Sequence, residues 1–134
     1  MEAEAPLGLI LWTTDIEGLA DFLVRAAGMR LDERHPGYAA LSAGPSRLYL
    51  HADEAYRGHP WYEALAKHGA ARGIGAEIRL QVPDVDYAYT AATRIGGIPV
   101  QAPCNQQFGV RECQVLGPDG FLVSLWSVSE ASAK

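Results

Sequence analysis

The sequence repeats a helical segment once, and this repeat limits the folds that the chain can adopt. Asp84 follows Asp15 by 69 residues, and the same offset relates two arginines and two glycines. These are a helix cap, a charge inside a helix and a helix-ending glycine, so the agreement indicates an internal duplication. The pairs are Asp15 with Asp84, Arg25 with Arg94, and Gly28 with Gly97.

The first half predicts a strand, a helix and three further strands. Leu7 to Thr13 is a short apolar run that is typical of a strand. Thr14 followed by Glu17 predicts a capping box, in which Thr14 caps the helix and Glu17 reaches back. Gly28 ends this helix. Strands are then expected at 29–34, 38–42 and 47–51, because Pro- and Gly-containing turns separate these runs.

The second half predicts the same order of elements. A strand at 76–82 leads to a helix that Asp84 caps and that runs to about Ile95. Strands follow at 98–104, 109–116 and 121–127. The last strand comes after Pro118-Asp119-Gly120, where Pro118 fixes φ and Asp119-Gly120 suits a corner with positive φ.

The expected product is one α+β domain of two tandem βαβββ modules, whose curved mixed sheets surround a groove. The first module spans 7–51 and the second spans 76–128. Between them, 52–75 is rich in Ala, Gly and His. Pro60 suits the start of a linker helix there, and Gly69 suits its end.

Composition narrows the function classes. The 134 residues are 49% hydrophobic with a net charge of −5 and no basic patch, which argues against nucleic acid or an anionic membrane as partner. The acidic start lacks the features of a signal peptide, and no stretch is long enough to cross a bilayer, so a cytoplasmic protein is expected. Cys104 and Cys113 are expected to be buried free thiols.

Side-chain alternation in the strand at 76–82 separates two faces. Ile78, Leu80 and Val82 should face the helices, so Glu77, Arg79 and Gln81 face the other way. A plain solvent face would also explain these three polar residues. Large rings, however, fall on the corresponding parity of other strands, and aromatic area with a few directional polar groups is typical of a ligand groove. The residues concerned are Trp12, Tyr49, His51 and Trp126.

The order of motifs resembles the vicinal oxygen chelate superfamily of glyoxalases, dioxygenases and bleomycin-resistance proteins. The resemblance covers about Leu7 to Ser127. The segments that carry it are Thr14-Asp15-Ile16-Glu17, Val82-Pro83-Asp84-Val85-Asp86, and Gly109-Val110-Arg111-Glu112 running on to Gly117-Pro118-Asp119-Gly120-Phe121.

In members with a metal, the resemblance places the ligands at Gly8, Glu77 and Ser124. Glycine offers no ligand, and a serine hydroxyl is a poor one. The resemblance is therefore to the metal-free, bleomycin-resistance type of binding protein, with no cofactor, no metal and no catalytic residue.

The expected function is sequestration of an aromatic or peptide-type antibiotic or natural product. Trp12, Tyr49, Trp61 and Trp126 are the candidate stacking platforms, although Trp61 could equally pack on its own core. The candidate polar contacts come from His51, Glu77, Arg79, Gln81 and Ser124. The resemblance also implies a homodimer, domain-swapped, with its grooves between subunits.

Two other functions stay open. The first is a small-molecule lyase or isomerase with Glu77 as base, with or without an atypical metal site that recruits His51. The second is an accessory protein of a biosynthetic pathway, which binds an intermediate without changing it. The sequence alone does not name the ligand.

Overall fold

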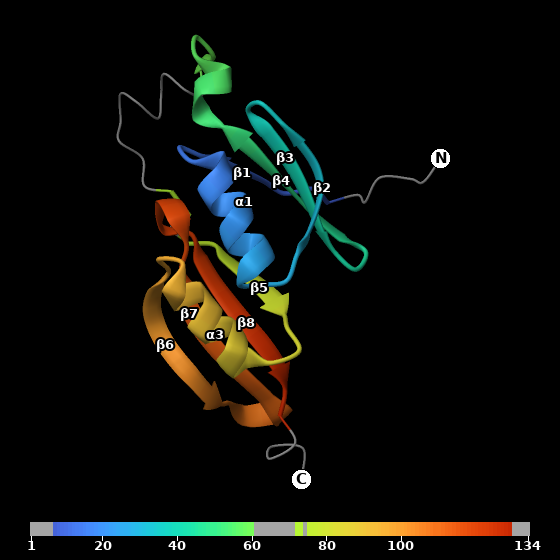
Figure 1. Cartoon of the computed structure of the whole chain (residues 1–134), viewed down its shortest axis with the longest axis vertical. Coiled ribbons are helices and arrows are strands. Elements are labelled where there is room, and N and C mark those ends of the chain that lie inside the picture. Colours follow the sequence, from blue (N-terminus) through green and yellow to red (C-terminus); the bar gives the residue numbers. More distant parts are fainter. Residues whose placement is uncertain (1–6, 61–71, 74, 130–134) are drawn as a thin grey trace.

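The computed structural model describes residues 7–60, 72–73 and 75–129. The predicted strands and the two predicted helices of the modules are all present, with ends shifted by a few residues (Figure 1). The elements are β1 (Ile10–Thr13), α1 (Ile16–Arg25), β2 (Arg30–His35), β3 (Tyr38–Ala43), β4 (Ser46–Ala52), β5 (Glu77–Gln81), α3 (Val85–Arg94), β6 (Ile98–Asn105), β7 (Val110–Leu116) and β8 (Leu122–Val128). Short 3-10 turns cover Asp53–Tyr56, Gln107–Gly109 and Pro118–Gly120. The predicted linker helix after Pro60 lies outside the described residues.

The strands form two four-stranded mixed sheets with the same internal order. Sheet A has the order β1-β4-β3-β2, and sheet B has the order β5-β8-β7-β6. In each sheet the first strand of the module pairs in parallel with the last, and the other pairs are antiparallel. The predicted two-module α+β fold is therefore confirmed.

The two helices correspond residue for residue at the 69-residue offset, and each begins at an aspartate. The Asp84 carboxylate accepts a hydrogen bond from the backbone N–H of Tyr87 at 3.1 Å, as predicted. The predicted Thr14 cap is wrong. Asp15 caps α1 instead, accepting from the backbone N–H of Gly18 at 2.9 Å, because the Thr14 hydroxyl donates to Asp119.

The glycines that follow the two helices differ by one position from the predicted repeat. Gly28 leaves α1 with φ of +71°, whereas after α3 the left-handed position belongs to Gly96 at +102°. Gly97 is small for a different reason. A Cβ there would lie 3.0 Å from the Phe22 ring and 2.7 Å from a backbone oxygen of α3.

One hydrophobic cluster contains buried residues of both modules. Phe22 of α1 lies at the junction, because its ring packs against Gly97 and Gly117 of the second module. Figure 1 shows α1 extending from sheet A toward the second module, where it contacts α3 and the Pro118–Gly120 turn. The modules thus share a core that the first helix fills.

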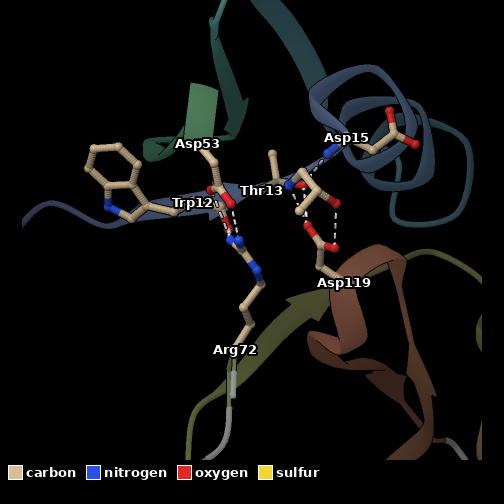
Figure 2. Close-up of polar contacts among 7 residues, drawn as sticks. Trp12, Thr13, Asp15, Asp53, Arg72 and Asp119 are labelled. Carbon is tan, nitrogen blue, oxygen red and sulfur yellow. Dashed lines mark hydrogen bonds and ion pairs between the residues drawn. The ribbon is translucent and has the colours of Figure 1, made fainter. Parts of the chain in front are cut away.

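The Pro118–Gly120 turn adds a polar connection between the modules. Asp119 adopts φ of +62° and Gly120 φ of +77°, as the turn chemistry predicts. The Asp119 carboxylate accepts hydrogen bonds of 2.7 Å from both hydroxyls and one backbone N–H of Thr13 and Thr14 (Figure 2). We call this group, Asp119 with Thr13 and Thr14, the clasp.

Burial raises the pKa of the Asp119 carboxyl, but its hydrogen bonds from Thr13 and Thr14 outweigh burial and hold the pKa below its ordinary value. The clasp is therefore formed by the ionised carboxylate at neutral pH. Among the described residues, no helix has both the length and the apolar composition needed to span a membrane.

Candidate functional site

The far face of each sheet is the one opposite its helix, and the predicted side-chain alternation is present in both modules. In β5, Ile78 and Leu80 pack against the core, while Arg79 between them is exposed on the far face. In β1, Leu11 and Thr13 are buried, and Trp12 between them is half-buried on the far face. The far faces hold all the described candidate residues.

Four rings gather on the far face of sheet A. The Trp12 and His51 ring centroids lie 5.1 Å apart edge to face, and those of Tyr38 and His51 lie 5.5 Å apart. Tyr38 and Tyr49 lie 6.3 Å apart with nearly parallel rings. We call these residues, Trp12, Tyr38, Tyr49 and His51, the aromatic cluster. Tyr38 was not predicted as a site residue, although its strand was.

The strand pairing explains why Tyr38 belongs to the aromatic cluster. His51 pairs with Trp12 across the parallel β1–β4 ladder and with Tyr38 across the antiparallel β3–β4 ladder. Paired residues point to the same face, so the three rings must meet. Antiparallel pairing through the 44–46 turn was the signal that could have identified Tyr38.

The aromatic cluster carries no net charge near neutral pH. Burial lowers the pKa of His51, so its imidazole is neutral at pH 7. Burial, followed by the Glu33 carboxylate and the Tyr49 hydroxyl, raises the pKa of Tyr38 and keeps its phenol protonated. The face therefore presents flat, neutral, half-buried rings, which suit the faces of another aromatic molecule.

A largely buried ion pair supports the strand at Trp12. The Arg72 guanidinium pairs with the Asp53 carboxylate and also donates a 2.7 Å hydrogen bond to the Trp12 carbonyl oxygen. Both charged side chains are at least four-fifths buried. Figure 2 shows Arg72 reaching this backbone while the indole points away from the ion pair. The contact fixes the backbone of β1 at Trp12.

The far face of sheet B carries charged and amide groups around one ring. The Arg79 guanidinium carbon lies 4.4 Å from the centre of the Trp126 ring, and its Nε lies 3.9 Å from a Glu112 oxygen. The Gln114 amide donates a 2.6 Å hydrogen bond to Glu77. We call these five residues, with Ser124, the polar cluster. Predicted Gln81 is exposed on the same face, paired with Trp126 in the ladder.

Sequence reasoning missed Glu112 and Gln114 because their position depends on the β7–β8 register. In that ladder Glu112 pairs with Trp126 and Gln114 pairs with Ser124. The aromatic cluster lies on sheet A and the polar cluster lies on sheet B. Within each cluster, every ring or polar contact joins residues of the same sheet. A groove with both faces as walls therefore remains a prediction, and Trp61 lies outside the described residues.

Ser124 is the most enclosed member of the polar cluster. Its side chain is fully buried, and its hydroxyl has no hydrogen-bond partner within the part of the chain that the structure describes. It pairs with Arg79 on one side and with Gln114 on the other. A buried hydroxyl without a partner is unfavourable by a free energy comparable to a lost hydrogen bond.

The residues at the superfamily's metal positions do not fit a metal ion. Gly8 has no side chain, the Ser124 hydroxyl is buried, and Glu77 is hydrogen-bonded to Gln114. No group of three or more His, Cys, Asp or Glu side chains that could hold an ion occurs among the described residues. The atypical site around His51 therefore has no ligand set in this part of the chain.

Two further features lie away from the far faces. A hollow of about 310 Å³ lies between α1 and α3 on the helical side, and its lining includes the repeated arginines Arg25 and Arg94. Both cysteines are free, as predicted, but only Cys113 is buried and Cys104 is half-buried. Burial raises the pKa of Cys113 to about 11, so this thiol is protonated and unreactive at pH 7.

No protein-family model matches this sequence, and no curated protein matches it either. Solved structures match nearly the whole chain. A glyoxalase/bleomycin resistance protein/dioxygenase family enzyme from Burkholderia phytofirmans PsJN is 24% identical with a TM-score of 0.74, covering 92% of this chain and 99% of that chain. A glyoxalase/bleomycin resistance protein/dioxygenase from Nocardioides is 21% identical with a TM-score of 0.64, covering 97% and 87%. TioX from Micromonospora sp. ML1 is 25% identical with a TM-score of 0.65, covering 93% and 97%.

This chain has the glyoxalase/bleomycin-resistance fold. The predicted resemblance to the vicinal oxygen chelate superfamily is thereby confirmed at the level of the fold. The names of the similar proteins combine glyoxalase, bleomycin resistance protein and dioxygenase, so the fold does not select a function. The function has to be argued from the two far faces.

Proposed function

We propose that this protein binds a planar aromatic natural product or antibiotic and sequesters it without changing it. The observation that carries the proposal is the aromatic cluster. Its rings are half-buried, neutral and in mutual contact, so they form a rigid surface with little conformational entropy to lose on binding. Trp126 under Arg79 offers a second ring on sheet B.

The charges on the far faces support binding through ring stacking with a few polar contacts. Arg79 is already paired with the Trp126 ring and lies near Glu112, so it is not an isolated anion site. Glu77 accepts from Gln114 and keeps an exposed carboxylate on the same face. These groups orient a ligand at the edge of the rings. In small-molecule sites, apolar and aromatic side chains usually supply most of the contact area, and a few polar groups fix the orientation of the ligand.

Calorimetric titration with planar aromatic compounds, among them acridone and doxorubicin, tests the proposal. The Trp12→Ala variant should bind about 5 to 150 times more weakly, which corresponds to about 1–3 kcal/mol for a lost aromatic contact. Trp12→Phe should retain most of the affinity. Tyr87→Ala is the matched control, because Tyr87 is an exposed aromatic residue on α3. No binding by the unmodified protein, or equal binding by Trp12→Ala, contradicts the proposal.

We also propose that the protein is a homodimer, because the resemblance implies paired grooves between subunits. The aromatic and polar clusters lie on separate sheets, so a second subunit can bring the aromatic face of one copy opposite the polar face of the other. Exposed Leu9 and Ile10 at the edge strand of sheet A offer apolar area for such contact. Light scattering during size-exclusion chromatography measures the mass directly, and a monomer at all concentrations contradicts the dimer.

The Glu77→Gln variant separates sequestration from the lyase or isomerase alternative. If Glu77 is a catalytic base, this variant loses turnover of a bound compound and keeps its affinity. Under sequestration, the compound is recovered unchanged from both proteins. Recovery is measured by chromatography after long incubation with each compound that binds, and a product that only the unmodified protein forms would establish an enzyme.

A further inference from the structure

Ser124 occupies an unusual place in the polar cluster. The same ladder position in sheet A, between the first and third strands of the module, is filled by Tyr49. The serine on sheet B is therefore much smaller than the ring that sheet A has at this position. Its hydroxyl is fully buried and has no partner among the described residues, although a hydroxyl can both donate and accept.

The side chains on both sides of Ser124 are long and are held by other partners. Arg79 lies over Trp126, and the Gln114 amide is bonded to Glu77. The Arg79 side chain is about 45% exposed, so its guanidinium can move through solvent without disturbing the core. Movement of Arg79 and Gln114 away from Ser124 would expose the hydroxyl to a ligand on the far face.

The charge on this face selects the kind of group that can reach Ser124. Glu77 and Glu112 carry two negative charges and Arg79 carries one positive charge, so the face is net negative. A carboxylate or phosphate would be repelled at this position. A neutral carbonyl oxygen needs only hydrogen-bond donors, and the Ser124 hydroxyl and the Gln114 amide can each supply one.

We infer that the Ser124 hydroxyl donates a hydrogen bond to a neutral carbonyl oxygen of the aromatic ligand, and so selects ring systems that carry a ketone or amide. This inference rests on the proposed function and on the predicted groove, because a ligand stacked on the aromatic cluster of sheet A reaches Ser124 of sheet B only where the two far faces enclose it together. Ser124 determines specificity and takes part in no chemical step. The unfavourable state of its hydroxyl in the free protein is relieved when the ligand binds.

The structure also predicts how a purely structural serine would differ. Ser129, just after β8, is buried as well, but its hydroxyl donates to the Asn105 side chain at 3.1 Å. Removing that hydroxyl breaks a hydrogen bond of the free protein, so Ser129→Ala should lower the thermal midpoint. Removing the Ser124 hydroxyl breaks no such bond among the described residues, so Ser124→Ala should keep or raise the thermal midpoint.

The test compares acridone, which has a ring ketone, with acridine, which has the same ring system without it. Calorimetry of the unmodified protein should show tighter binding of acridone. Ser124→Ala should weaken acridone binding about tenfold, the equivalent of one hydrogen bond, and leave acridine binding unchanged. Ser129→Ala should change neither affinity.

The outcomes separate this inference from the proposed function. If neither compound binds, the inference is overturned, and the proposed function is overturned with it when doxorubicin does not bind either. If both bind, but the ratio of their affinities is the same in Ser124→Ala, the carbonyl contact is wrong and the aromatic surface stands. If Ser124→Ala lowers the thermal midpoint as Ser129→Ala does, the hydroxyl already has a partner in the free protein, and the inference is overturned as well.

Discussion

The far faces of the two sheets occupy equivalent positions on a repeated scaffold, yet they carry different chemistry. In sheet A one ladder row across β1, β4 and β3 consists of three rings, and its counterpart across β5, β8 and β7 keeps one ring between an amide and a carboxylate. The neighbouring row holds a tyrosine between apolar residues in sheet A, and a serine between an arginine and a glutamine in sheet B. The rows are Trp12-His51-Tyr38 against Gln81-Trp126-Glu112, and Ile10-Tyr49-Ala40 against Arg79-Ser124-Gln114.

The features that the two modules share are those that the fold requires. Asp15 and Asp84 each cap a helix, and the first and last strands of each module pair in parallel. The far faces contribute little to these features, because their side chains point away from the common core. One module can therefore present a stacking surface and the other a polar one without loss of the scaffold.

The largest expected effect concerns the helices, which are not equivalent at the junction. Phe22 of α1 fills the space against the second module, whereas the residue 69 positions later is Ala91. Phe22→Ala should lower the free energy of unfolding by about 3–5 kcal/mol, because it leaves a cavity in the shared core. Urea denaturation measures this loss. Tyr87→Ala on α3 should change it by less than about 0.5 kcal/mol, and equal losses would contradict an asymmetric junction.

A smaller effect distinguishes the turns that precede the last strand of each sheet. Only the turn before β8 carries an aspartate that bonds to the other module. Asp119→Asn keeps a residue that tolerates positive φ but removes the charge, and should lower stability at pH 7 by about 1–2 kcal/mol. Asp21→Asn, on the exposed surface of α1, is the control and should have little effect.

The contribution of the clasp to the free energy of unfolding depends on pH. The folded-state pKa of Asp119 is lowered, so its contribution is complete above the unfolded pKa near 3.8 and is lost as pH falls through the folded value. The stability difference between the unmodified protein and Asp119→Asn should therefore shrink below about pH 4. Denaturation midpoints at several pH values measure this, and a difference that stays constant down to pH 2 contradicts an ionised clasp.

The smallest effect tests the equivalence of the scaffold itself. Asp15→Ala and Asp84→Ala should each lower the free energy of unfolding by about 1 kcal/mol, because each removes one cap from a helix of the same length. Thermal or urea denaturation gives both values. Two losses that differ by more than about 1 kcal/mol would show that the repeat preserves shape but not the local contribution of the caps.

The sequence predicted the fold well because the signals for strands and helices are local. Alternation in 76–82, turn residues at 118–120 and the 69-residue offset each depend on neighbours or on counting. The cap of α1 was mispredicted because Thr14 and Asp15 are both good capping residues. What decides between them is Asp119, which lies more than 100 positions away and binds Thr14.

The site was predictable only in part for a similar reason. Parity within one strand placed Trp12, Arg79 and Trp126 on the far faces. Tyr38 and Gln114 depend on the register between strands, which parity within one strand does not give. The burial of Ser124 could not be predicted from the sequence for another reason. It depends on how the side chains around it are arranged, and no spacing in the sequence encodes that arrangement.

The parallel pairing of first and last strands has a consequence for how the chain is made. During synthesis β1 is made before β4, so it has no ladder partner until β4 has followed it. The Thr13 and Thr14 groups wait still longer, because the Asp119 that binds them is among the last folded residues to be synthesised. β1 is therefore made early in this domain and secured late, and until then its apolar residues lack their native contacts.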